Sequence, residues 1–209
     1  MIAPAAPLVF VVDDDASVRK SLARLVKAAG YEVETFASVR GFLARAPHEG
    51  PCCLLLDVRM PGVTGLDLQE TLRAAGQRVA IVFITGYRDV PVSVKAMKGG
   101  AVDFLTKPVD EETLLGAIRQ AVARTQTDRQ HQARVAEIRS RIATLTPREA
   151  AVFALVVTGM LNKQIGSELG IAEKTVKVHR ARVMEKMRAG SLAELVRLAD
   201  EGRVIATGS

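Results

Sequence analysis

Polar and charged side chains follow four apolar runs in the first half of the chain. Asp13–Asp15 come after the first run, Asp57 after a later one, and Thr85 and Lys107 after two more. If the runs are parallel strands, their carboxyl ends share one edge of a sheet, where open α/β folds bind ligands. A lone aspartate in such a place is usually a helix cap. An acid, a hydroxyl and an amine at one edge instead indicate a reaction site.

The chemistry of this group is that of phosphoryl transfer. Carboxylates that converge repel one another and need a cation, and ligands that are all oxygen favour a hard ion, Mg²⁺ or Mn²⁺. A carboxylate beside such an ion can attack phosphorus and form an acyl phosphate. The amine of Lys107 would neutralise charge on the transferred group, and the hydroxyl of Thr85 would donate a hydrogen bond to it.

The segments that must position this group alternate between strand-like and helix-like patterns. Strands are predicted at 8–13, 31–36, 52–57, 79–85 and 102–106, and three of them are almost continuous apolar runs, as in a parallel sheet covered on both faces. Apolar residues at helical spacing lie between and after them, most clearly Val18, Leu22, Leu25 and Val26, and Leu114, Leu115, Ile118, Ala121 and Val122. Five βα units predict an α/β doubly wound open sheet, since a barrel needs eight.

Four stretches of the first part match a known family. "VFVVDDD", "LLLDVRMPGVTG", "VFITG" and "AVDFLTKP" closely resemble the receiver domain of bacterial two-component response regulators, over residues 8–122. The resemblance implies a flavodoxin-like (βα)5 receiver domain at 1–122. It also implies a sensor histidine kinase as the partner that donates the phosphoryl group.

The same resemblance assigns roles around the metal. Asp57 is the implied phosphoacceptor. Asp14 holds the Mg²⁺ or Mn²⁺ ion directly and Asp13 through water. Asp57 itself and the main-chain carbonyl of Arg59 are the further implied ligands.

Three more residues acquire implied roles in the response to phosphorylation. Thr85 is the switch hydroxyl, Lys107 the cation, and Phe104 the aromatic side chain whose position follows phosphorylation. Plain core packing in a strand is the alternative for Phe104. The Lys107–Pro108 peptide bond is typically cis in this family. Asp15 is interpreted as the N-cap of the helix that starts at Ala16.

The composition changes in the second part of the chain. Residues 123–142 are polar and free of Gly and Pro, which predicts a helical linker before a second domain at 143–209. Up to residue 121 the chain has 14 Lys+Arg and 14 Asp+Glu, whereas from residue 122 it has 15 and 9. The whole net charge of +6 therefore lies in the second part, and it suggests an anionic partner. A solvated basic surface is the alternative.

The second domain has the layout of a small all-α helix-turn-helix. Thr146 and Ser191 each predict a helix N-cap with a glutamate three residues on. Between those helices, "NKQIGSEL" and "EKTVKVHRARVMEKM" are separated by "GIA". The predicted core is Ile165, Leu169, Ile171, Val176 and Val183, and the outward face of the second helix is Lys174, Lys177, Val178, Ala181 and Arg182. A basic outward face of this kind suits docking in the major groove of DNA.

Residues 145–201 resemble the LuxR-type helix-turn-helix of the NarL/FixJ response regulators, and "ITGYRDVPVSVKAMKGGAVDF" looks like the FixJ side of that family. By resemblance, Lys177 and Val178 approach base edges. The implied phosphate contacts are Asn162, Lys163, Lys174, His179 and Arg182. Ala181 stands where some relatives carry a base-contacting polar residue, so the operator cannot be transferred from them. Ala172 stands at the N-cap of the recognition helix, where Ser or Asp is usual, a loss of about 1 kcal/mol.

The last helix, from Ser191, carries the apolar residues Leu192, Leu195, Val196 and Ala199. In the family it forms the dimer contact of the DNA-binding domain, and packing onto its own domain is the alternative.

The predicted function is phosphorylation-dependent transcription regulation. Phosphorylation at Asp57 would change receiver dimerisation or domain contacts, and a homodimer would bind double-stranded promoter DNA and contact RNA polymerase. One alternative is a constitutive DNA-binding protein with a receiver that does not switch. Another is a Mg²⁺-dependent phosphatase with an aspartate nucleophile, but that class has a D-x-D motif, whereas Val58 and Arg59 follow Asp57. The receiver is expected to catalyse at most its own phosphoryl transfer and dephosphorylation.

The composition and the start of the sequence indicate the cellular compartment that we expect for this protein. No apolar run approaches the roughly 20 residues that a bilayer span needs, and the start of the chain has no basic region typical of a secretion signal. Cys52 and Cys53 are adjacent in a predicted strand and would face opposite sides, so we expect no disulfide between them. A cytoplasmic protein without a membrane partner is the expectation.

Overall fold

The structure, a computed structural model, describes residues 6–77, 79–86 and 90–202. Contacts divide the chain into two compact units, Met1–Arg129 and Gln130–Ser209. Residues 87–89, which belong to the FixJ-like motif, lie outside the described residues. No helix in the described ranges is both long and apolar enough to cross a membrane.

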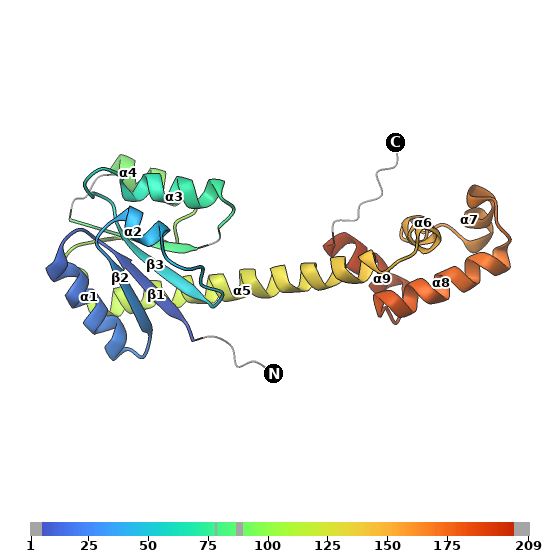
Figure 1. The fold of residues 1–209 in the computed structure, drawn as a ribbon, viewed down its shortest axis with the longest axis horizontal. Coiled ribbons are helices and arrows are strands. Elements are labelled where there is room, and N and C mark those ends of the chain that lie inside the picture. Colours follow the sequence, from blue (N-terminus) through green and yellow to red (C-terminus); the bar gives the residue numbers. More distant parts are fainter. Residues whose placement is uncertain (1–5, 78, 87–89, 203–209) are drawn as a thin grey trace. The chain divides into compact units, whose positions relative to one another are not determined.

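Unit 1 is built on a parallel sheet of five strands (Figure 1). The strands are β1 Leu8–Val12, β2 Glu32–Phe36, β3 Cys52–Asp57, β4 Ala80–Thr85 and β5 Asp103–Thr106. Their order in the sheet is β2-β1-β3-β4-β5. The helices are α1 Ala16–Ala28, α2 Val39–Leu43, α3 Gly65–Ala74, α4 Val90–Lys98 and α5 Glu111–Ala143. The predicted doubly wound flavodoxin-like fold is confirmed, with each strand within one residue of its predicted bounds.

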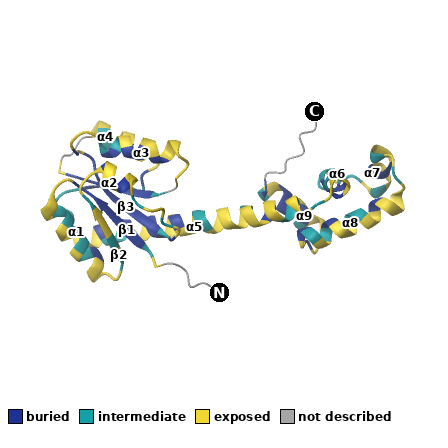
Figure 2. Cartoon of the chain, viewed as in Figure 1, coloured by how far each residue is buried: buried dark blue, intermediate teal, exposed yellow. Residues whose placement is uncertain are grey.

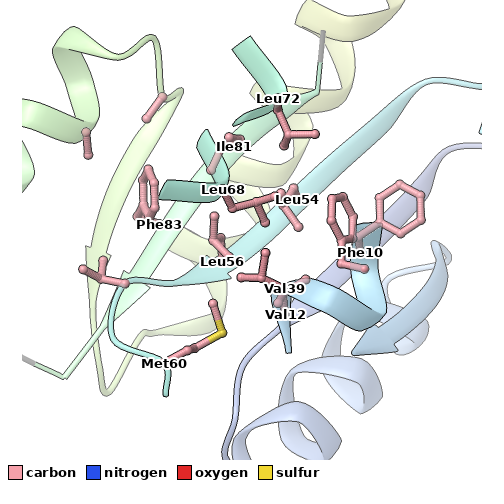
Figure 3. Close-up of a cluster of buried hydrophobic side chains, with 14 of the residues drawn as sticks. Phe10, Val12, Val39, Leu54, Leu56, Met60, Leu68, Leu72, Ile81 and Phe83 are labelled. Carbon is pink, nitrogen blue, oxygen red and sulfur yellow. The ribbon is translucent and has the colours of Figure 1, made fainter. Parts of the chain in front are cut away.

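Because side chains alternate along each strand, the central strands contribute to an apolar cluster on each face of the sheet. Leu54 and Leu56 join α2, α3 and α4 in one apolar cluster, part of which is drawn in Figure 3. Cys53 and Leu55 join α1 and α5 in the cluster on the opposite face. The central strands are accordingly buried along their length (Figure 2). Cys52 and Cys53 belong to different clusters and are free, as predicted.

Unit 2 is all-helical. It contains the last part of α5 together with α6 Pro147–Val156, α7 Asn162–Leu169, α8 Glu173–Met187 and α9 Leu192–Glu201. The predicted helix-turn-helix core is confirmed: Ile165, Val176 and Val183 are buried, with Leu169 and Ile171 packed against them. The segment predicted as a helical linker is part of α5, and its Ile138 is buried in the core of unit 2.

The helix caps explain where several elements start. The side chain of Asp15 accepts hydrogen bonds from the amides of Ser17 and Val18, and Thr146 forms a full capping box with Glu149. Ser191 caps α9, but the carboxylate of Glu194 accepts from the amide of Gly190 instead of completing a box. As expected from Ala172, α8 starts without a side-chain cap among the described residues.

The start of α3 packs directly behind β3, and Gly65 permits this close approach. A Cβ atom at Gly65 would lie 2.3 Å from the main-chain oxygen of Asp57 and 3.1 Å from side-chain atoms of Leu56 and Phe83. The Gly65 amide also donates to the carbonyl of Val58 at 3.1 Å. The close packing of α3 therefore helps to fix the position of the strand end that carries Asp57.

We predict that Gly65→Ala destabilises unit 1 by about 1–3 kcal/mol, because the new methyl group overpacks against main-chain atoms. Gly116→Ala is the matched control. A Cβ at that position in α5 meets only the end of the Arg119 side chain, at 3.9 Å, and should stabilise by about 0.5–1 kcal/mol. Urea unfolding followed by circular dichroism measures both. Equal stability of the two variants would contradict the close approach.

Candidate functional site

An ion-paired cluster forms at the carboxyl edge of the sheet. Asp13 directly follows β1 and Asp57 ends the neighbouring strand β3, and both are buried. The ammonium Nζ of Lys107, which follows β5, lies 2.6 Å from Asp13 Oδ2 and 2.9 Å from Asp57 Oδ1. One cation thus bridges two carboxylates that come from adjacent strands.

The second oxygen of each carboxylate is held by a main-chain amide. Asp15 donates its N–H to Asp13 Oδ1 at 2.9 Å, and Arg59 donates its N–H to Asp57 Oδ2 at 2.7 Å. Each carboxylate therefore has one charged and one neutral donor, which fixes its orientation. The side chain of Arg59 itself is exposed.

The pKa values of the bridge reflect burial and mutual attraction. Burial raises the pKa of Asp57, and the hydrogen bond and charge of Lys107 oppose this only in part. For Lys107, burial alone would lower the pKa. Its hydrogen bonds to Asp13 and Asp57 and their charges outweigh that effect, so the pKa of Lys107 is raised and the amine stays protonated.

The remaining predicted residues lie around this bridge. Thr85 is buried at the end of β4, and its main-chain carbonyl accepts the N–H of Lys107 at 2.7 Å. Phe104 in β5 is half-buried, with its ring 6.1 Å from that of Phe83. Asp14 is exposed. The Lys107–Pro108 peptide bond is cis, as the resemblance implied.

The donor set fits a hard cation in its chemistry. The available ligands are carboxylate and main-chain oxygens, which Mg²⁺ and Mn²⁺ prefer. Within the described ranges, however, no three His, Cys, Asp or Glu side chains stand close enough together to hold an ion. Asp13 and Asp57 are paired by Lys107, and the third carboxylate available is that of Asp14, exposed on the same loop as Asp13.

Arg19 contacts the loop that carries Asp13, a role that the sequence did not indicate. Its guanidinium Nη1, on the first turns of α1, donates to the main-chain carbonyl of Asp13 at 2.7 Å. This contact fastens the loop that carries Asp13 and Asp14. An arginine on the exposed side of a predicted amphipathic helix gives no sequence signal of such a contact.

The residues predicted to face outward on α8 are exposed in the structure. They are Lys174, Lys177, Val178, Ala181 and Arg182. Val178 shows 47% of its surface, although an apolar side chain of this size is usually covered. Lys177 pairs with Glu173 one turn earlier at 3.1 Å, and Lys163 is exposed on α7.

Two of the predicted phosphate contacts are instead half-buried. The Asn162 side-chain oxygen accepts a hydrogen bond from Arg180 Nη1 at 3.0 Å, which ties the start of α7 to α8. The ring of His179 is half-buried, and its Nδ1 has no hydrogen-bond partner in the described structure. The sequence analysis left Arg180 unassigned, and the structure gives it this intramolecular partner.

An ion pair between the half-buried Lys186 and the buried Glu149 holds α8 against α6. Lys186 Nζ lies 2.6 Å from Glu149 Oε2, and the same carboxylate accepts the main-chain N–H of Thr146 at 2.8 Å. The hydrogen bond from Lys186 and then that from Thr146 lower the pKa of Glu149 to about 2. Sequence reasoning identified Glu149 only as part of a capping box, because Lys186 is 37 residues away.

Comparison with known proteins places both units in families. The response regulator receiver domain matches residues 9–119, and the luxR family of bacterial regulatory proteins matches residues 143–199. The chain is a response regulator of the NarL/FixJ family. Its function is phosphorylation-dependent regulation of transcription, and the family is not one of classical enzymes, which argues against the phosphatase alternative.

Relatives of this response regulator align along most of its length. Nodulation protein W of Bradyrhizobium diazoefficiens is 49% identical over 193 residues, which covers 92% of this chain and 85% of the relative. Transcriptional regulatory protein FixJ of Azorhizobium caulinodans is 45% identical over 192 residues, covering 91% and 90%.

Solved structures of response regulators are similar to this chain along most of its length. The response regulator StyR has a TM-score of 0.84 at 48% identity, covering 94% of this chain and 100% of that one. Full-length FixJ from B. japonicum has a TM-score of 0.58 at 39% identity, covering 97% and 100%.

The low pKa of Glu149 predicts acid sensitivity of unit 2. Because its pKa is lower when folded, the carboxylate contributes stability that is complete above its ordinary value of 4.5. That contribution should be lost as the pH falls from 4.5 towards about 2. Urea unfolding of the helical signal at several pH values measures it.

Lys186→Met removes the partner of Glu149 and should flatten this pH dependence while lowering stability at pH 7. Glu185→Gln, an exposed position on the same helix, is the control and should leave the pH profile unchanged. An unaltered profile in Lys186→Met would show that the ion pair does not control it.

Proposed function

We propose that Asp57 accepts the phosphoryl group from a sensor histidine kinase. The observation that supports this most is the ion pair of Asp57 with Lys107. The Asp57 carboxylate ends a strand and lies 2.9 Å from the Lys107 ammonium group, which can pair with a phosphoryl oxygen after transfer. The oxygen of Asp57 attacks phosphorus, the bond from phosphorus to the imidazole nitrogen of the kinase breaks, and an acyl phosphate forms.

Other residues of the receiver prepare this step. Asp13 and Asp14, together with Asp57 and the main-chain carbonyl of Arg59, are the proposed ligands of Mg²⁺ or Mn²⁺, which when bound neutralises charge on the transferred group. Lys107 keeps Asp57 oriented before transfer and pairs with a phosphoryl oxygen afterwards. The receiver catalyses at most this transfer and the later hydrolysis of its own acyl phosphate.

The new charge drives the switch. A phosphoryl group adds about −1.5 to −2 charge at a buried position. The Thr85 hydroxyl then donates to a phosphoryl oxygen, and Phe104 turns inward from its half-buried position in β5. The altered surface of the receiver favours homodimerisation or changed domain contacts.

The output is binding of two DNA-binding domains to promoter half-sites about one helical turn apart. Lys177 and Val178 on α8 contact base edges. The phosphate contacts are Lys163, Lys174, His179 and Arg182, with Asn162 at the start of α7. The bound dimer acts through RNA polymerase, in the cytoplasm where the promoter lies. The apolar face of α9 supplies a dimer contact, since Leu192 and Val196 are 37% and 40% exposed.

We predict that Asp57→Asn abolishes phosphorylation by acetyl phosphate and Mg²⁺, because the amide is not a nucleophile towards phosphorus. The variant should bind DNA with the low affinity of the unphosphorylated protein. A phosphate-affinity gel and DNA-binding anisotropy measure the two effects. Asp110→Asn, at an exposed aspartate, is the control. DNA binding by Asp57→Asn as tight as by activated wild type would favour the constitutive alternative.

Lys177→Ala should weaken binding to the preferred operator by about 1–3 kcal/mol and relax base preference at one position in each half-site. The operator can be selected from randomised duplexes. Arg139→Ala, on the exposed side of α5, should leave affinity unchanged apart from a weak general charge effect. Unchanged affinity and base preference in Lys177→Ala would refute the assignment of α8 as the recognition helix.

A further inference from the structure

A cavity of about 370 Å³ lies in unit 1 at the amino ends of β3 and β4, at the opposite edge of the sheet from Asp57. We call it the basal cavity. It is lined by Leu43, Arg45, Pro47, His48, Cys52, Gln77, Val79 and Arg129. These residues come from the end of α2, the segment between α2 and β3, the start of β3, the segment between α3 and β4, and α5. Its size is at the lower end of the range for ligand sites.

The charge of its lining is uniformly basic. Arg45 and Arg129 carry positive charge, and no carboxylate is among the lining residues. Burial raises the pKa of the Cys52 thiol, so that group stays neutral and supplies no counter-ion.

Both arginines have only neutral partners in the described structure. The Arg45 guanidinium lies 3.8 Å from the centre of the Phe42 ring and 4.7 Å from that of Phe10, and its Nη1 donates to the carbonyl of Phe42. Its Nε is buried with no hydrogen-bond partner. Glu34 acts on this charge through space, but no ion pair joins the two. Burial accordingly lowers the pKa of Arg45.

Arg129 likewise has neutral hydrogen-bond partners in the described structure. Its guanidinium donates to the main-chain carbonyls of His48, at 2.7 Å, and of Glu49. These contacts give the Arg129 guanidinium hydrogen-bond acceptors, but they do not neutralise its positive charge. Two guanidinium groups line one cavity, with no carboxylate among its lining residues, and their planar donors match carboxylate and phosphate oxygens.

We propose that the basal cavity binds a small organic carboxylate. The anionic end is held by Arg45 and Arg129. The apolar body contacts Leu43, Pro47 and Val79, which would have no favourable contact with a bare inorganic ion. This apolar part of the lining is why we assign an organic carboxylate and not inorganic phosphate.

Such a ligand would reinforce an existing attachment of α5 to the sheet. One turn before Arg129, the Thr125 hydroxyl accepts the N–H of Cys52 and donates to its carbonyl, each at 3.0 Å. Arg129 adds the contacts to the segment before β3. A carboxylate between Arg45 and Arg129 becomes a further link between that segment and α5, and it should stabilise the folded receiver by mass action. The basal cavity lies at the edge of the sheet opposite to Asp57.

The test is titration of the full chain with isovalerate, benzoate and inorganic phosphate, by calorimetry and by amide NMR shifts. We expect saturable binding of at least one of the two carboxylates, tighter than that of phosphate. The shifted amides should lie in 43–52 and 125–129 and at Gln77 and Val79. Failure of both carboxylates to saturate, or tighter binding of phosphate, would overturn the proposal.

Variants locate the site. Arg129→Gln should weaken carboxylate binding at least about ten-fold, the cost of losing one hydrogen-bonded charge. Arg119→Gln, an exposed arginine on the same helix, should bind as wild type does. Leu43→Trp places a larger side chain at a position that is 44% exposed, so it should fill the cavity without unfolding the receiver. Undiminished binding in both Arg129→Gln and Leu43→Trp, with native circular dichroism, would refute the site.

Discussion

The pairing of Lys107 with Asp13 and Asp57 is the constraint on which the receiver depends. Parallel pairing of β1 with β3 brings the two carboxylates to neighbouring positions at one edge of the sheet, where they repel each other. The ammonium of Lys107 compensates both at hydrogen-bond distance. Removing one member of a buried charged group leaves the others unpaired, at a cost that exceeds that of the lost contact alone.

The same bridge links Asp57 to the neighbouring strands. Lys107 is fixed at its main chain by the carbonyl of Thr85 in β4 and at its side chain by residues of β1 and β3. Any change of charge at Asp57 therefore acts on a residue that touches three strands. This arrangement gives a physical reason why modification of one carboxylate can alter the surface formed by the later strands and helices.

In unit 2, Glu149 and Lys186 form the ion pair that links separate elements. Their ion pair joins the start of α6 to the last turns of α8, while Arg180 and Asn162 join α8 to α7. The outward side chains of α8 carry none of this structural duty.

The sequence by itself determined the order of elements, the caps of α1, α6 and α9, the alternation of buried residues in the sheet and the exposed face of α8. These features depend on local periodicity and on residues three or four apart, such as Thr146 with Glu149. The strand pattern also placed Asp13, Asp57 and Lys107 at one edge of the sheet, but the tertiary structure alone decided which charged atoms pair. Lys107 reaches Asp13 and Asp57 across 94 and 50 residues, and Arg129 reaches His48 across 81. Contacts at such separations leave no periodic trace in a single sequence, because they arise only when packing brings distant strand ends and helices together.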